Sequence, residues 1–311
     1  MHSIKKVLAL PLLSAALLLA FRPAPPSAEA LKAEALLDLQ AHYAQYQQVA
    51  QRIWGFAEVG YKETKSSALL QETLRKNGFA VQAGVAGIPT AFVATYGSGQ
   101  PVIGILAEYD ALPGLAQQAV AEKAPIAGQN AGHGCGHNLF GTASVAAGIE
   151  IKKLLKEGQL HGTIKVYGCP AEEGGSGKVY LVRAGLFEGV DAVLHWHPAS
   201  ENATMVGKYI ANVSAKFRFH GVAAHAAAAP ERGRSALDGV EALDHMVNMM
   251  REHVPQETRI HYVITNGGKA PNVVPDFAEV YYYVRHPNRD QVKDVFARVV
   301  KAAEGDRKSV V

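Results

Sequence analysis

The sequence predicts an α/β protein in which a domain with a mostly parallel sheet is followed by a smaller α+β domain. Up to about residue 200, short continuous apolar runs alternate with segments of helical periodicity, the pattern of a sheet covered by helices. After Met205 the strands alternate polar and apolar residues, as expected where one face of a sheet is exposed. A hydrophobic fraction of 48% supports a sizeable core, and a formal net charge of +3 is too small to indicate nucleic-acid binding.

Residues 1–30 have the features of a secretory signal peptide. Two lysines precede the apolar run 7–21, and Ala28-Glu29-Ala30 supplies a small-x-small cleavage pattern. A membrane anchor is the alternative, but an apolar run of about fifteen residues is short for a bilayer that needs roughly twenty. We therefore expect a secreted or periplasmic protein with no stable membrane anchor after cleavage.

The first domain is expected to span residues 31–204. Helical spacing of apolar residues marks the segments 31–54, 63–76, 138–155 and 178–184. Short buried strands are predicted at residues 90–96, 102–107, 163–168 and 192–194. This alternation of strands and helices predicts the parallel arrangement.

The second domain is expected to span residues 205–305. Its predicted elements are a strand at 212–220, a helix at 235–253, strands at 259–265 and 277–285, and a helix at 290–303. The order β-α-β-β-α is that of a ferredoxin-like split βαβ motif without its last strand. One-faced alternation in the strands fits a small sheet covered by two helices.

Polar side chains follow the buried strands of the first domain. In open α/β sheets ligands bind where strands end, so these positions are the first candidates for a site. They present carboxylate, thiol and imidazole groups in four places, namely Glu108-Tyr109-Asp110, the loop His133 to Asn138, Glu172-Glu173 and His195-Trp196-His197. The sequence therefore predicts that these groups meet at one rim of the sheet.

Cys135 and His137 have the spacing and chemistry of metal ligands. Two residues apart in an extended loop, their side chains can point the same way, and the flanking glycines allow close bending around an ion. Thiolate and imidazole both suit zinc. Each residue alone is more simply a buried apolar cysteine or a loop histidine, but together with the other strand ends they favour a metal site. One disulfide between Cys135 and Cys169 is also possible, since these are the only two cysteines.

Glu172 and Glu173 can divide two roles between them. Adjacent residues cannot both face the same atom, so one can bind metal while the other contacts a water molecule and acts as a general base. A solvated acidic loop is the alternative. Spacing does not decide whether His195 or His197 joins them.

Four strings resemble the signature of the metallopeptidase family that includes aminoacylases, hippurate hydrolases and bacterial carboxypeptidases. They are residues 107–113, 132–138, 170–175 and 191–198, and the second is most similar to aminobenzoyl-glutamate hydrolases and related dipeptidases. The resemblance implies two divalent metal ions, zinc or alternatively manganese or cobalt. It implies the ligands Cys135, His137, Glu173 and His197, with Glu172 as the general base. Asp110 takes the place of an aspartate that orients a ligand, although the family's usual His-x-Asp is Glu108-Tyr109-Asp110 here.

The second domain resembles the lid and dimerisation domain of the same family at residues 221–230, 271–276 and 281–285. This implies a homodimer in which His225 stabilises the oxyanion in the partner subunit's site, while Asn272 and Arg285 hold the substrate carboxylate. A planar guanidinium suits bidentate binding of a carboxylate. Without the resemblance, His225 is more simply a lone histidine in an alanine-rich stretch.

The expected function is metal-dependent hydrolysis of the amide bond in an N-acyl amino acid, an aminobenzoyl-glutamate-like compound or a dipeptide. One alternative is a thiol hydrolase with Cys135 as nucleophile and His137 or His197 as base. Another is an inactive relative that only associates through its lid.

The resemblance also implies a return of the chain to the first domain after the lid, with one more histidine ligand. The sequence has six residues after Gly305, so we expect a catalytic domain incomplete in its C-terminal half and a truncated or aberrant tail at 306–311. A chain lacking that ligand is expected to be poorly soluble and weakly active or inactive.

Overall fold

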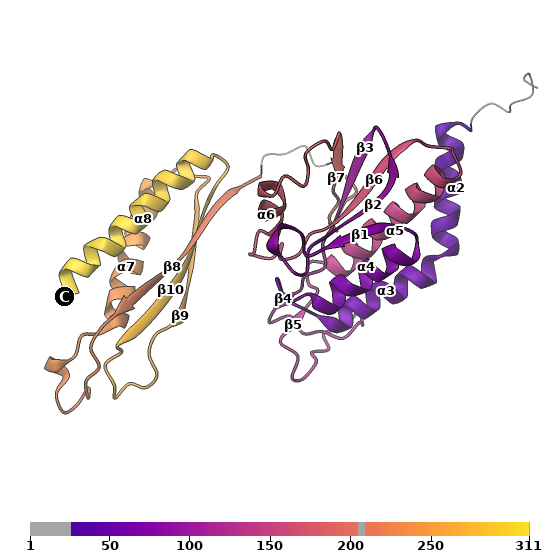
Figure 1. Ribbon diagram of the computed structural model, residues 1–311. Coiled ribbons are helices and arrows are strands. Elements are labelled where there is room, and N and C mark those ends of the chain that lie inside the picture. Colours follow the sequence, from indigo (N-terminus) through magenta and orange to yellow (C-terminus); the bar gives the residue numbers. More distant parts are fainter. Residues whose placement is uncertain (1–25, 205–208, 311) are drawn as a thin grey trace, which may run out of the picture. The chain divides into compact units, whose positions relative to one another are not determined.

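The computed structural model describes residues 26–204 and 209–310, with side chains up to residue 305. The chain folds into two compact units that divide between Asn202 and Ala203 (Figure 1). Most of the predicted signal peptide lies outside the described residues, so that prediction is untested. Among the described helices, none combines the length and the apolar character needed to cross a membrane.

The first unit is built on a five-stranded mixed sheet in the order β1-β2-β6-β3-β7. Its strands are β1 (Ala80–Ala83), β2 (Phe92–Ser98), β3 (Val102–Ala107), β6 (Gly162–Gly168) and β7 (Ala192–Leu194). β6, β3 and β7 are parallel, whereas β2 is antiparallel to both β1 and β6. The α/β class is confirmed, but the sheet is less parallel than predicted. The reason is the three-residue link from β2 to β3, which is too short for the crossover that parallel strands need.

Helices cover both faces of this sheet. They are α2 (Ala28–Ala41), α3 (Tyr43–Phe56), α4 (Thr64–Lys76), α5 (His137–Lys156) and α6 (Gly177–Arg183). The core on one face joins α3, α4 and α5 to the strands through Ile53, Leu70, Val145 and Ile105. Leu106, the next residue of β3, points to the opposite face, where it packs with residues such as Phe140 and Leu181.

Two details of the first unit differ from the predicted elements. The helix expected at 31–54 is interrupted at His42, which separates α2 from α3. A short ladder of β4 (Leu112–Pro113) with β5 (Ala131–Gly132) and the 3-10 turn η1 (Val85–Gly87) had no sequence signal that we recognised.

The second unit is a three-stranded antiparallel sheet in the order β8-β10-β9, with two helices on one face (Figure 1). Its elements are β8 (Ala211–His220), η2 (Pro230–Arg232), α7 (Ala236–Met250), η3 (Arg251–His253), β9 (Arg259–Asn266), β10 (Phe277–His286) and α8 (Arg289–Val310). The core is made of alternate β10 residues and one apolar stripe from each helix, including Val280, Tyr282, Leu243 and Val295. The predicted order β-α-β-β-α is confirmed.

One buried carboxyl group in the first unit makes its stability depend on pH. Glu150 of α5 is 3% exposed, and its Oε1 lies 4.0 Å from Lys153 Nζ, which binds Asp38 of α2 at 2.9 Å. Burial, together with the nearby Asp38 carboxylate, raises the pKa of Glu150 to about 7. Because the folded state holds this proton more tightly than the unfolded state, stability is lost as pH rises from the ordinary carboxyl range through about 7.

Replacing Glu150 by Gln is therefore expected to stabilise the first unit at pH 8, with a rise in melting temperature on the order of 3 °C. The gain should shrink towards pH 5, where the wild-type carboxyl group is protonated as well. Fluorescence of Trp54 and Trp196, the two tryptophans of the chain, reports unfolding of this unit alone. A gain of equal size at both pH values would contradict the assigned protonation.

Candidate metal centre

The parallel strands of the first unit deliver the predicted side chains to one edge of the sheet. Glu108 follows β3, Glu172 and Glu173 follow β6, and the segment from His195 to His197 follows β7. Since β6, β3 and β7 are adjacent and parallel, their carboxyl ends meet. His137 joins them as the first residue of α5.

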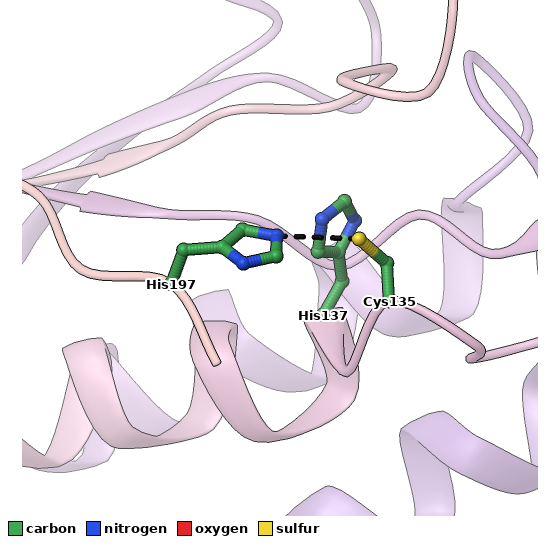
Figure 2. Close-up of side chains that lie close together, drawn as sticks. All are labelled: Cys135, His137 and His197. Carbon is green, nitrogen blue, oxygen red and sulfur yellow. Dashed lines mark hydrogen bonds between the residues drawn. The ribbon is translucent and has the colours of Figure 1, made fainter. Parts of the chain in front are cut away.

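Cys135, His137 and His197 converge on one point (Figure 2). Their ligand atoms all lie within 4.8 Å of one another, and Cys135 Sγ is 3.2 Å from His197 Nε2. Gly136 makes the tight turn between Cys135 and His137. Its φ is 79°, a conformation that would be strained in a residue with a side chain. Three of the four predicted ligands are thus brought together.

Asp110 fixes the orientation of two candidate ligands. Its Oδ1 lies 3.0 Å from His137 Nδ1, and its Oδ2 accepts a hydrogen bond of 2.8 Å from the Glu173 backbone N–H. Because Nδ1 faces this carboxylate, Nε2 is the ring nitrogen that points into the site. The geometry is the one expected for a residue that orients a ligand.

The loop that holds Glu172 and Glu173 is anchored by a buried carboxylate. Glu63 accepts a hydrogen bond of 2.8 Å from the Ala171 backbone N–H and another from Thr90 Oγ1. Ala171 has φ of 55°, a conformation that a non-glycine residue holds only where its surroundings impose it. The Glu172 side chain is 42% exposed, whereas Glu173 Oε1 is buried. The two glutamates therefore face different environments, as two different roles require.

Glu108 belongs to the site, although no role for it was predicted from the sequence. It is 1% exposed, and its Oε1 accepts from Lys178 Nζ and, at 3.2 Å, from His195 Nε2. Its Oε2 lies 3.0 Å from His137 Nε2. With His137 and Glu172 it forms a second group of possible ligand atoms within 4.8 Å of one another. Its position directly after a buried strand was the available signal.

The buried acceptor atoms of this pocket fit a cation. Among the described residues, Glu108 Oε2, His137 Nε2 and Glu173 Oε1 are buried without a hydrogen-bond partner. Leaving such atoms unsatisfied costs about 1–3 kcal/mol each, more for charged groups. A metal ion bound by sulfur, nitrogen and carboxylate oxygen would satisfy them, and this donor set suits zinc.

The pKa values of Cys135 and His137 are both raised, for different reasons. Burial, and next the Glu173 carboxylate, raise the pKa of the Cys135 thiol to about 12. Burial opposes charge on His137, but Asp110 and Glu108 outweigh it and raise the pKa of that imidazole to about 10. Carboxylates contribute to both shifts, but burial is the larger cause for Cys135 and opposes the shift of His137.

The possible disulfide between Cys135 and Cys169 is not formed, because both residues are free cysteines. Cys169 is fully buried, and its thiol donates to the Tyr167 carbonyl at 3.4 Å. It packs as a small apolar residue within the core.

The three predicted residues of the second unit fall in two places. His225 is exposed and lies beside Asn272, since Ala226 N–H donates to the Asn272 carbonyl at 3.0 Å. His225 Nδ1 accepts from two backbone N–H groups, so Nε2 carries the proton. Asn272 lies in the loop just before β10, which begins at Phe277. Arg285 is close to the end of the same strand, roughly 27 Å from Phe277 at about 3.4 Å per residue. Within one chain Asn272 and Arg285 therefore lie far apart along β10, and their joint contact with a substrate carboxylate stays a prediction.

Both units are similar to parts of known proteins. Residues 211–309 match the family model of the peptidase dimerisation domain. The chain is 46% identical over 269 residues to a p-aminobenzoyl-glutamate hydrolase subunit of Escherichia coli (strain K12), covering 86% of this chain and 56% of that protein. It is 30% identical over 281 residues to thermostable carboxypeptidase 1 of Saccharolobus solfataricus, covering 83% of this chain and 68% of that protein.

A solved structure from Bacillus subtilis, described as a dinuclear metal-binding peptidase of the M20 family, has the same fold with a TM-score of 0.57 at 20% identity. That match covers 87% of this chain and 72% of the other. An α/β domain joined to a peptidase dimerisation domain defines a two-domain peptidase fold. The chain belongs to the M20 peptidase family, and it spans about half the length of the Escherichia coli relative.

Replacing Asp110 by Asn should weaken metal binding by about 10- to 100-fold, because the amide cannot accept from both His137 and the Glu173 backbone. Isothermal titration with zinc measures the change. Asp191→Asn is the matched control, since Asp191 accepts from the Val102 backbone at the opposite end of β3. Equal affinity in both variants would show that Asp110 does not orient the ligands.

Proposed function

We propose that the protein is a metal-dependent amidohydrolase that cleaves an amide bond of an N-acyl amino acid, an aminobenzoyl-glutamate-like compound or a dipeptide. The observation that carries the proposal is the convergence of Cys135, His137 and His197 beside buried acceptor atoms without partners. The names of the relatives, an aminobenzoyl-glutamate hydrolase and a carboxypeptidase, support the reaction class and the range of substrates.

Cys135, His137, Glu173 and His197 would hold two divalent ions, with zinc preferred for the thiolate and imidazole donors and manganese or cobalt as alternatives. When bound, the metal supplies polarisation of the amide carbonyl and a more acidic water. Asp110 keeps His137 in the tautomer that binds metal and holds the Glu173 backbone.

Glu172 is the proposed general base. Its partly exposed carboxylate has Oε2 3.8 Å from His137 Nε2, close to the ligand atoms while still open to water. It takes a proton from the attacking water as the new C–O bond forms. It then gives that proton to the amide nitrogen as the C–N bond breaks, so the products are a carboxylic acid and an amine.

A thiol mechanism is the main competing proposal, because the 3.2 Å separation of Cys135 Sγ and His197 Nε2 also suits a nucleophile and base. The neighbouring carboxylates argue against it. Burial, and next these carboxylates, raise the pKa of the thiol, whereas nucleophilic cysteines are activated by a lowered pKa. A thiolate bound to a metal ion is compatible with the same surroundings, since the ion supplies the missing positive charge.

Replacing Glu172 by Gln is expected to lower kcat by about two orders of magnitude or more, with metal content nearly unchanged. The test measures the activity of both proteins on a panel of N-acyl amino acids, aminobenzoyl-glutamate and dipeptides. The metal bound per chain is measured in the same samples. Loss of metal in the variant would make Glu172 a ligand instead.

Chelation separates the two mechanisms in the same assays. The metal mechanism requires loss of activity with a chelator and recovery on adding zinc or manganese. Inactivation by thiol alkylation alone, with chelators without effect, would favour Cys135 as the nucleophile. A dimer without activity on any substrate, seen by size-exclusion mass, would indicate a relative that only associates.

We further propose a homodimer formed through the second unit, in which His225 donates from Nε2 to the oxyanion in the partner subunit's site. The match to a peptidase dimerisation domain supports association, and the exposed, protonated Nε2 suits donation. The function of His225 would then require the other chain.

Mixing two inactive variants tests this arrangement. A dimer of one Glu172→Gln chain and one His225→Ala chain keeps one intact site if His225 acts across the interface, so an equal mixture should regain about a quarter of wild-type activity. His245→Ala, an exposed histidine on α7, is the control and should remain active alone. No recovery in a mixture shown to exchange subunits would place His225 outside the partner's site.

A further inference from the structure

We propose that Glu108 is a further metal ligand, which binds through Oε2 the same ion as His137 Nε2. This inference rests on the proposed metal-dependent function and adds a donor outside the set Cys135, His137, Glu173 and His197. Lys178 and His195 then serve to hold the other oxygen of the Glu108 carboxylate.

The first step is the contact between Glu108 and His137. Their Oε2 and Nε2 atoms lie 3.0 Å apart, both residues are at most 1% exposed, and neither atom makes a hydrogen bond within the described part of the chain. His137 Nδ1 already faces Asp110, so Nε2 is the ring nitrogen that remains for an ion. A buried imidazole nitrogen and a buried carboxylate oxygen at this separation can bind the same cation.

The spacing suits two ligands of one ion. Metal–ligand distances near 2.1 Å place neighbouring ligand atoms roughly 3.0 to 3.4 Å apart, for right-angle and tetrahedral geometry, and the observed 3.0 Å lies at the lower end of that range. Glu172 Oε2 is farther from His137 Nε2, at 3.8 Å, which leaves it room to contact a water beside the ion. Glu108 and Glu172 therefore fit different tasks in the same group of atoms.

The second step is the way in which the carboxylate is held. Oε1 accepts from both Lys178 Nζ and His195 Nε2, so rotation of the group is blocked and Oε2 is left for the ion. A side chain at Gly141, one turn after His137 on α5, would clash with the Glu108 carbonyl oxygen at 2.3 Å. This close packing of helix on strand end keeps His137 and Glu108 at a fixed separation.

A purely structural role for Glu108, as the ion-pair partner of a protonated His137, predicts a different result when Glu108 is replaced. In that case the removal of Glu108 would change folding but not the coordination of a bound metal. Metal binding must therefore be measured directly, by a signal that separates one ligand from the others.

Cobalt(II) titration of the full chain supplies that signal. Cobalt bound by Cys135 gives a near-ultraviolet thiolate charge-transfer band, while its visible bands report the number and type of the other ligands. Glu108→Gln is expected to keep the thiolate band, alter the visible bands and weaken cobalt binding at least about 10-fold. Glu150→Gln also neutralises a buried glutamate in the first unit. It is expected to leave the thiolate band, the visible bands and the cobalt affinity unchanged.

A second variant covers the case in which Glu108→Gln fails to fold. Glu108→Asp keeps the charge and shortens the side chain, so it should fold, as judged by tryptophan fluorescence, and still bind cobalt at least about 10-fold more weakly. Wild-type affinity and unaltered visible bands in a folded Glu108 variant would overturn this inference and leave the proposed function intact. Wild-type protein that binds no cobalt, or binds it without a thiolate band, would overturn both.

Discussion

The contact between Asp110 and His137 ties together the three segments on which the site depends. Asp110 follows β3, His137 begins α5, and the second oxygen of Asp110 holds the backbone of Glu173 after β6. All three positions are fixed by one carboxylate that is 1% exposed. Because it is buried, its hydrogen bonds are not weakened by competition with water, and both partners are held in the orientation that a metal ion requires.

The direction of the strands explains why the chemistry could be located from the sequence. Residues that follow parallel neighbours must share an edge, so Glu172, Glu173, His197 and the loop before α5 could be expected to meet. The Cys135 and His137 pair was visible as well, since its spacing and flanking glycines are local. The second unit was equally accessible, because its two-residue strand periodicity and helical stripes are properties of short segments.

The remaining site residues depend on contacts that no local pattern records. Glu108 meets Lys178 and His195 across 70 and 87 residues, and Glu63 binds the backbone of Ala171 across 108. Spacing could not divide the roles of the histidines after β7, whereas the structure places His197 at Cys135 and His195 at Glu108. The separation of Asn272 from Arg285 was likewise invisible, since it follows from the length of β10.

Several carboxyl groups gather around His137, and this links the fold to the ligand that we propose. Glu108, Asp110 and Glu172 lie within 4 Å of His137, and the described positive partners are Lys178 and the site histidines. Carboxylates gathered in a buried pocket repel one another and lose hydration, so without a further cation the folded state is destabilised. A divalent ion that binds the folded chain and not the unfolded one removes that repulsion and adds stability in proportion to the logarithm of its concentration. The same carboxylates that would position metal and water for hydrolysis would thereby make metal binding a part of folding.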